Sequence, residues 1–205
     1  MLKIFCVNCG CESLKLICGT CTKKLQETCC LRSHSIFFKD QQIEVHYFWE
    51  YDLVLKKLFK AAKYKFQKSL LISLAQIASK KLVYDFGKAT VTYIPTTYLR
   101  YCFRGFNPSK VIAKTLFRGD LHKILSRTSF TRSQSQKNKK DRFNSVQNLF
   151  KIKNPTFKIA EELILVDDIC TTGSTLCQAQ KTILQNDPEV KIKIVVLAYT
   201  PKAMF

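Results

Sequence analysis

A buried strand that runs into two adjacent acidic residues constrains this chain more than any other feature. The apolar run Leu163–Val166 leads directly into Asp167 and Asp168, and a turn of small residues follows before a predicted helix. Adjacent carboxylates at a strand end repel each other and lose hydration, which is costly without a partner. We therefore expect the two acids to accept hydrogen bonds from paired ligand hydroxyls, close to a bound cation.

The turn after the acids suits a phosphate group. Its hydroxyls can donate, its glycine lets the backbone approach closely, and the helix N-terminus presents unpaired N–H groups. These residues are Thr171, Thr172, Gly173, Ser174 and Thr175. Acids for a ribose and a hydroxyl-rich turn for its phosphate together predict a phosphoribosyl site. An ordinary strand-to-helix turn with an Asp cap is the alternative interpretation.

This segment resembles the phosphoribosyl-pyrophosphate (PRPP) motif of type I phosphoribosyltransferases. The resemblance implies that Asp167 and Asp168 hold the ribose 2′- and 3′-hydroxyls, that residues 171–175 bind the 5′-phosphate, and that Mg²⁺ accompanies PRPP. Several such enzymes carry a carboxylate for proton transfer at the position of Thr171, and a threonine hydroxyl cannot do that work at neutral pH. The catalytic residue stays unknown, and so does whether the chain is an enzyme.

The cysteines predict a metal site near the N-terminus. Seven of the ten cysteines lie in the first 35 residues, and four of them form two Cys-x-x-Cys pairs separated by eight residues. Structural Zn²⁺ held by four thiolates fits this spacing, and so short a segment has too little core to fold without it. The predicted ligands are Cys6, Cys9, Cys18 and Cys21. The roles of three further cysteines stay open: Cys11, which could compete as a ligand, Cys29 and Cys30.

We predict three parts of the chain: a zinc ribbon at 1–40, a helical connecting segment at 41–87, and a phosphoribosyltransferase-like domain at 88–205. Strands and helices alternate in the third part, at 88–94, 109–125, 163–166, 174–185 and 190–198. This α/β alternation predicts a parallel sheet with ligands at the carboxyl ends of its strands. The polar, patternless stretch 128–144 is predicted to be a basic, flexible loop.

Four residues after the strand at 88–94 are candidates for binding pyrophosphate: Thr96, Thr97, Arg100 and Arg104. The two arginines are four residues apart, so in a helical turn both guanidinium groups can face one anion. A pair of solvated surface arginines is the alternative.

The net charge of +19 is concentrated in one region. Residues 100–158 hold 15 Lys and Arg against two Asp and Glu. This surplus favours a polyanionic partner, either nucleic acid or an anionic membrane face, over a merely solvated surface. Within the loop, five residues are candidates for contacting a nucleic-acid backbone or for closing over PRPP: Arg132, Lys137, Lys139, Lys140 and Arg142. A disordered, solvated segment is the alternative.

Along nearly its whole length the chain resembles the ComF family of competence-associated proteins. The resemblance rests on the double Cys-x-x-Cys start, on Tyr51 and Lys63-Tyr64, and on the PRPP motif. It also rests on several further positions: Ile94–Thr97, Arg100, Arg104–Asn107, Thr128, Gln134, Arg142 and Phe150. It implies a zinc ribbon followed by a phosphoribosyltransferase-like domain that acts in DNA uptake during natural transformation.

The resemblance also implies partners and a location. We expect binding to PRPP and to single-stranded DNA at the cytosolic side of the inner membrane, with a competence translocase or helicase as a further partner. No apolar run is long enough to span a membrane and the start lacks a signal-peptide pattern, so we expect a cytoplasmic protein, free or peripheral at the inner membrane. A nucleobase-salvage phosphoribosyltransferase and a protein that binds PRPP without turnover are the alternatives.

Overall fold

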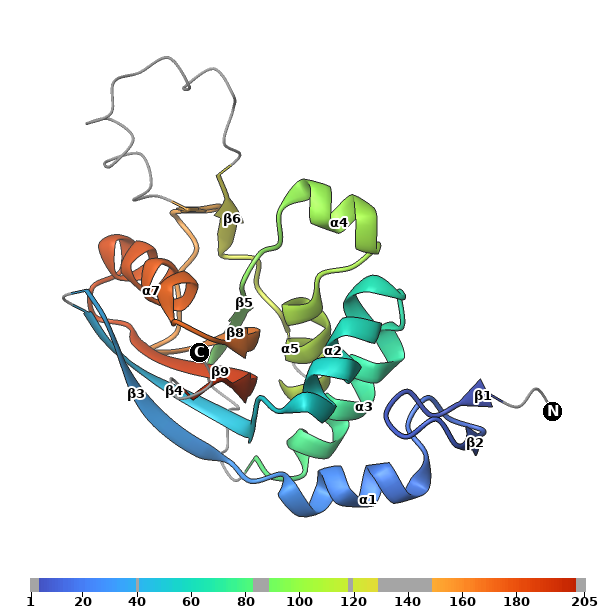
Figure 1. Ribbon diagram of the computed structural model, residues 1–205. Coiled ribbons are helices and arrows are strands. Elements are labelled where there is room, and N and C mark those ends of the chain that lie inside the picture. The colour runs from blue at the N-terminus through green and yellow to red at the C-terminus, as the bar shows by residue number, and fades with distance from the viewer. Residues whose placement is uncertain (1–3, 40, 83–88, 118–119, 129–148, 202–205) are drawn as a thin grey trace.

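Five strands form the central sheet of the computed structural model, in the order β3-β4-β9-β8-β5 (Figure 1). Their bounds are β3 Arg32–Phe38, β4 Gln41–Glu50, β5 Thr90–Tyr93, β8 Glu162–Cys170 and β9 Lys191–Tyr199. The structure describes residues 4–39, 41–82, 89–117, 120–128 and 149–201. Strands β4, β9, β8 and β5 run parallel, as predicted, whereas the edge strand β3 is antiparallel to β4. A tight connection between Phe38 and Gln41 explains β3, because only antiparallel neighbours can be joined so closely.

Residues 41–50 correct the expectation of a helical segment at 41–87. They form β4, which lies between β3 and β9. Every second residue from Ile43 to Trp49 is buried, and this period of two is typical of a strand. The part that is helical comprises α2, Leu53–Tyr64, and α3, Lys68–Ser79.

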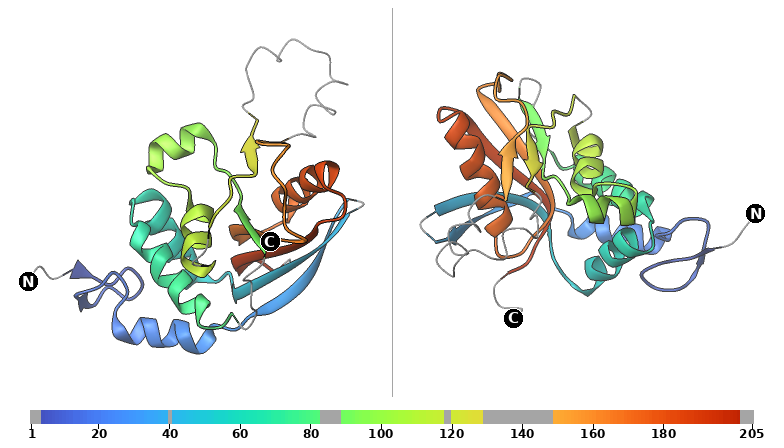
Figure 2. Two further views of the ribbon diagram at one scale, coloured as in Figure 1. Left: turned by 180° about the vertical axis from the view of Figure 1, so that it is seen from behind. Right: turned by 90° about the horizontal axis from the view of Figure 1, so that it is seen from above.

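Helices cover both faces of the sheet (Figure 2). Helices α2, α3 and α5, Pro108–Phe117, pack on one face, and α7, Ser174–Asn186, packs on the other. Alternate residues of β8 supply the two cores: Ile164 and Val166 face the first, whereas Leu163 and Leu165 face the second. Strand β8 is therefore held rigidly from both sides where it approaches the acidic pair.

The helix predicted at 109–125 is shorter than expected. Helix α5 ends at Phe117, and Leu125 begins β6, Leu125–Arg127, which pairs with β7, Phe150–Ile152. The sequence has a glycine at position 119, and glycine is a helix stop signal. The prediction of a helix to residue 125 did not take this glycine into account. The helix predicted to begin at Ser174 is confirmed. Asp52 caps α2 by accepting a hydrogen bond of 2.8 Å from the Leu55 N–H group.

The N-terminal module consists of β1, Ile4–Phe5, β2, Glu12–Ser13, and α1, Gly19–Thr28. Its buried cysteines belong to the same core as α2 and α3. The indole N–H group of Trp49 in β4 donates a hydrogen bond of 3.0 Å to the carbonyl of Leu25 in α1. The module thus packs against the main body, and the domain boundaries at 40 and 87 stay predictions.

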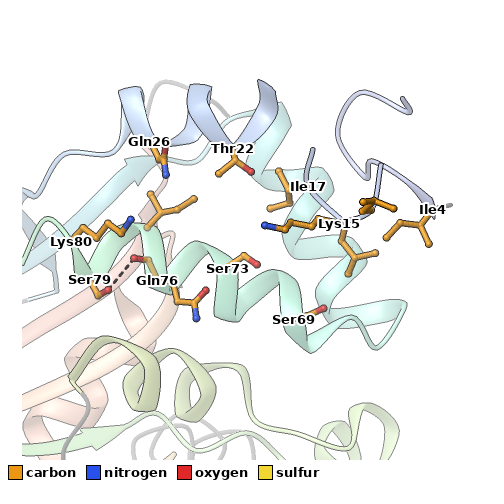
Figure 3. A pocket seen from close by; sticks show the side chains of 13 residues that line it. Ile4, Lys15, Ile17, Thr22, Gln26, Ser69, Ser73, Gln76, Ser79 and Lys80 are labelled. Carbon is orange, nitrogen blue, oxygen red and sulfur yellow. Dashed lines mark hydrogen bonds between the residues drawn. The ribbon is translucent and has the colours of Figure 1, made fainter. Parts of the chain in front are cut away.

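A cavity of about 730 Å³ separates the N-terminal module from α3. Figure 3 shows Ser69 and Ser73 of α3 on one side and Thr22 and Gln26 of α1 on the other, with Lys15 reaching in between. Among the described residues, none of those predicted to bind a ligand or a metal lines it.

Candidate functional site

Strand β8 carries the two acids, Asp167 and Asp168, beyond the end of the neighbouring strand β5. The last residue of β5, Tyr93, pairs with Val166, so Asp167 and Asp168 extend beyond β5 while β8 continues beside β9. Both acids are half-buried and line a cavity of about 290 Å³. The carboxyl end of a parallel strand is where α/β proteins bind ligands, and this position agrees with that rule.

Asp167 is held by α5. The Ser109 hydroxyl donates a hydrogen bond of 2.7 Å to Asp167 Oδ1, and the Asp168 N–H group donates to the same oxygen at 2.8 Å. Burial raises the pKa of the Asp167 carboxyl to about 7, and the charge of Asp168 adds to the rise, while the Ser109 hydrogen bond opposes it. An acid of this kind can change protonation state near neutral pH.

Asp168 is held by α2. Lys63 Nζ lies 2.6 Å from Asp168 Oδ2, and the Ile169 N–H group donates a hydrogen bond of 2.7 Å to Asp168 Oδ1. Spacing in the sequence does not distinguish whether Lys60, Lys63 and Lys65 form a solvated face or help to form an anion site. The structure places Lys63 in the cavity, whereas Lys60 and Lys65 are exposed.

The turn from Thr171 to Thr175 forms a small pocket of about 50 Å³ at the start of α7. Gly173 adopts a left-handed backbone with φ of 76°, and a Cβ atom there would lie 3.0 Å from Ile36 Cγ2. The Thr172 hydroxyl donates a hydrogen bond of 3.2 Å to the Ser174 hydroxyl. Glycine is therefore needed for both the turn and the packing, and the hydroxyls gather at a helix N-terminus.

The opposite wall of the cavity comes from the segment after β5. Thr96, Arg100 and Arg104 line it together with Asp167, Asp168 and Thr175. Helix α4, Tyr98–Arg104, carries the two arginines one turn apart, and the Arg104 guanidinium lies 5.5 Å from the centre of the Tyr64 ring. Thr97 does not line this cavity. Its hydroxyl accepts a hydrogen bond of 3.4 Å from the Arg100 N–H group and so caps α4.

Two further residues of the cavity were not among the predicted site residues. One is Ser109, the first residue of the helix predicted at 109–125; the cap of α5 is Asn107, since its Oδ1 accepts a hydrogen bond of 3.3 Å from the Lys110 N–H group. Arg127 at the end of β6 lines the same cavity, and burial lowers its pKa. No sequence signal separated Arg127 from the other basic residues of its region. The loop candidates Arg132, Lys137, Lys139, Lys140 and Arg142 lie outside the described residues.

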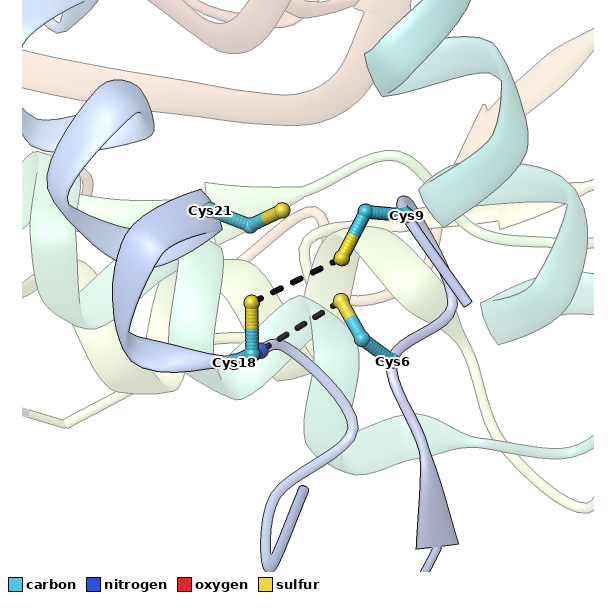
Figure 4. Close-up of side chains that lie close together, drawn as sticks. All are labelled: Cys6, Cys9, Cys18 and Cys21. Carbon is cyan, nitrogen blue, oxygen red and sulfur yellow. Dashed lines mark hydrogen bonds between the residues drawn. The ribbon is translucent and has the colours of Figure 1, made fainter. Parts of the chain in front are cut away.

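The four predicted zinc ligands converge (Figure 4). The sulfur atoms of Cys6, Cys9, Cys18 and Cys21 all lie within 4.8 Å of one another. Zn–S bonds of about 2.3 Å in a tetrahedron require sulfur–sulfur separations of roughly 3.8 Å. The Cys9 and Cys18 sulfur atoms are 3.7 Å apart, so the cluster can hold a structural metal such as Zn²⁺.

Neighbouring donors favour the thiolate form of Cys6. Burial by itself raises the pKa of the Cys6 thiol, but hydrogen bonds from the backbone at Cys18, Cys9 and Asn8 outweigh burial and lower the pKa to about 6. At Cys21 the Asn8 side-chain amide donates a hydrogen bond of 3.3 Å to Sγ, which lowers the thiol pKa, but burial and the neighbouring sulfur atoms raise it overall, to about 12. Of the other cysteines in this region, Cys11 is exposed with its sulfur 3.3 Å from Cys9 Sγ, Cys29 is buried, and Cys30 is exposed.

Comparison with known proteins agrees with this geometry. Residues 104–204 match the family model described as "Phosphoribosyl transferase domain". The chain is 29% identical over 101 residues to the DNA utilization protein YhgH of Escherichia coli K12, and 30% identical over 98 residues to that of Escherichia coli O157:H7. These alignments cover 47% and 45% of this chain, but only 43% and 42% of the relatives.

Residues 104–204 are thus similar to a phosphoribosyltransferase-type domain, and the chain folds as a mostly parallel sheet flanked by helices. The match to that domain, the identity to the DNA utilization proteins and the four-cysteine cluster support the resemblance to the ComF family. Among the described residues, no helix has the length and apolar character needed to cross a bilayer.

Proposed function

We propose that the cavity lined by Asp167 and Asp168, here called the cleft, binds Mg²⁺-PRPP. We further propose that the protein acts in DNA uptake during natural transformation. The observation that carries the PRPP proposal is one cavity in which the acidic pair of β8, the start of α7 and the arginines of α4 meet. A ligand that has both a vicinal diol and phosphate groups at its two ends is complementary to this arrangement. The names of the two relatives, DNA utilization proteins, support the connection with DNA.

Each wall has a separate task in this proposal. Asp167 and Asp168 accept hydrogen bonds from the ribose hydroxyls, for which each carboxylate retains lone pairs beyond those used by Ser109 and Lys63. The turn at 171–175 binds the 5′-phosphate through backbone N–H groups and hydroxyls. Thr96, Arg100 and Arg104 face the pyrophosphate, with Thr97 holding α4 in place.

Mg²⁺ enters this scheme with the diphosphate. Oxygen ligands suit it, and the cleft offers them on Asp167 and Asp168. When bound, Mg²⁺ would neutralise phosphate charge, while Lys63, Arg100, Arg104 and Arg127 supply the remaining positive charge from the chain itself. Affinity for PRPP should then require added Mg²⁺.

Isothermal titration with Mg²⁺-PRPP tests the proposal. We expect Asp168→Asn to weaken binding by about tenfold or more, because a hydrogen bond to a charged acceptor contributes about 1.5 to 3 kcal/mol. Glu161→Gln is the matched control, since Glu161 is an exposed carboxylate immediately before β8 that pairs with Lys191 at the start of β9. Equal affinity of the Asp168 variant and the wild type would reject the PRPP site.

DNA uptake is tested in cells. A deletion strain complemented with Asp167→Ala/Asp168→Ala should transform poorly, whereas wild-type complementation should restore transformation. We place the protein at the cytosolic side of the inner membrane, in contact with single-stranded DNA and with a translocase or helicase. Normal transformation by the double variant would remove the cleft from the process.

Nucleobase salvage is the alternative function. Among the described residues, Asp167 and Asp168 are the carboxylates that line the cleft, so a separate base for proton transfer to a nucleobase is missing from its walls. A pyrophosphate-release assay with adenine, guanine, hypoxanthine, orotate and uracil decides the matter: turnover supports salvage, and tight PRPP binding without turnover supports a binding protein.

A further inference from the structure

Helix α4 exposes an unusual amount of apolar surface for its length. None of its seven residues is buried. The side chains of Tyr98, Leu99 and Tyr101 are 81%, 80% and 50% exposed. Single exposed apolar residues are ordinary, but a contiguous group on one short element is typical of a contact surface.

These three side chains border the groove beside α4, a hollow of about 880 Å³. Four cationic residues line the same groove: Arg100, Lys110, Lys123 and Arg127. Lys110 Nζ lies 5.9 Å from the centre of the Tyr93 ring, so a ring and a cation are already paired in the groove. No carboxylate among the described residues lines it.

The groove opens into the cleft. Pro95, Thr96, Arg100, Asn107 and Arg127 line both hollows. A ligand that fills the groove would therefore lie directly beside whatever occupies the cleft. Figure 1 shows α4 standing clear of the sheet.

Exposed rings that alternate with cations fit one kind of partner. In a single-stranded nucleic acid the bases are free to stack on aromatic side chains, and the phosphates between them attract cations. In a duplex the bases are already stacked on one another, so tyrosine rings gain little. An anionic membrane fits less well, because it prefers a convex apolar face whose cations lie at the rim, whereas here the cations line a concave surface.

We propose that the groove beside α4 is the binding surface for single-stranded nucleic acid, with bases stacked on Tyr98 and Tyr101 and phosphates held by Lys110 and Lys123. This rests on the proposed function in that it gives the DNA partner a surface, one whose four named contacts lie outside the loop at 128–144. It does not require PRPP to bind.

Fluorescence anisotropy with a labelled 20-mer of thymidylate tests the stacking. Tyr98→Ala/Tyr101→Ala should weaken binding by about tenfold or more, because each base–aromatic stack is worth about 1 to 3 kcal/mol. Tyr98→Trp should retain the affinity. A 20-mer of abasic sites should bind the double variant and the wild type equally, since it has no base to stack. Phe37→Ala, at a residue of β3 that is 65% exposed, is the matched control and should have no effect.

The cations are tested through salt. Lys110→Ala/Lys123→Ala should reduce the slope of log affinity against log salt concentration by about 1 to 2, because each phosphate contact contributes roughly 0.7 to the slope for single strands. The control is Lys57→Ala, an exposed lysine on α2.

The outcomes separate this inference from the PRPP proposal. Loss of oligonucleotide binding in the tyrosine variant with unchanged PRPP affinity supports the groove. The inference is overturned if the wild type binds no oligonucleotide, if the tyrosine variant binds as well as the wild type, or if the loss is equal on the abasic strand. Binding to anionic phosphatidylglycerol vesicles that depends on Tyr98 and Leu99, without oligonucleotide binding, would assign the surface to membranes and overturn it too. Failure of PRPP binding alone leaves the groove intact.

Discussion

Lys63 Nζ lies 2.6 Å from Asp168 Oδ2, which ties the end of α2 to the acidic pair of β8. Lys63 precedes the residues that match the phosphoribosyl transferase domain, which begin at 104. The cleft is therefore completed by a helix from outside the matched region.

Removing the Lys63 cation should cost stability. The two side chains are only 18% and 14% exposed, so Lys63→Met leaves a half-buried carboxylate without its partner. We expect the free energy of unfolding in urea to fall by about 1 to 3 kcal/mol. Lys60→Met, at an exposed lysine of the same helix, should change it by less than about 0.5 kcal/mol. If Lys63→Met costs as much when Asp168 is already Asn, the ion pair is not the cause.

Metal removal should unfold the N-terminal module. Cys6, Cys18 and Cys21 are buried in the same core as α2 and α3, so losing a ligand disturbs more than the module itself. We expect one zinc per chain by elemental analysis and a lowered melting temperature for Cys21→Ser or after chelation. Cys11→Ser is the control and should retain the metal. Retention of metal by Cys21→Ser together with loss of metal by Cys11→Ser would reverse the ligand assignment.

Stability should fall as the pH rises towards neutrality. Burial and the neighbouring Asp168 raise the pKa of Asp167 from 3.8 to about 7 in the folded protein. Between pH 3.8 and about pH 7 the folded state binds more protons than the unfolded state. The contribution of Asp167 to the free energy of unfolding is therefore complete below about pH 4 and is lost as the pH rises through 7. We expect a loss of about 1 to 3 kcal/mol across that range, allowing for partial exposure.

Asp167→Asn isolates this effect, because an amide does not titrate. The difference in unfolding free energy between wild type and variant should change steadily from pH 4 to pH 8 in favour of the variant. A constant difference would show that Asp167 titrates normally. Glu161→Gln, at an exposed carboxylate immediately before β8, is the control.

Gly173→Ala should be costly for two reasons. Its backbone is left-handed, and the added Cβ atom would lie 3.0 Å from Ile36 Cγ2. We expect a loss of about 1 to 3 kcal/mol of unfolding free energy and weaker PRPP binding, since the turn at 171–175 must shift. Gly19→Ala is the control, because Gly19 has open space at the Cβ position. Equal stability of both variants would show that the turn tolerates a side chain.

The sequence predicted the parts of the fold whose signals are local. The strand at Leu163–Val166, the turn at Gly173 and the cysteine pairs each place their chemistry within a few consecutive residues. Each is found in the structure, although β8 continues beyond the predicted end, through both acids to Cys170. Strand β4 was mistaken for part of a helical segment, although its alternation from Ile43 to Trp49 was visible.

Local sequence signals did not predict that Lys63, Ser109 and Arg127 belong to the site. Each becomes part of the site only because packing brings a distant helix or strand to β8, and sequence spacing does not encode such contacts. The hydrogen bond from Ser109 to Asp167 joins residues 58 positions apart. From the sequence alone, Ser109 was only the first residue of a predicted helix.

The place of β9 in the sheet affects how the chain is made. This strand comes last in sequence but lies between β4 and β8. During synthesis the position between β4 and β8 therefore stays empty until β9 has been made. The sheet can form completely only when Tyr199 has left the ribosome. Until then the edges of β4 and β8 are open to other strands, so a chaperone that shields them would raise the yield of folded protein.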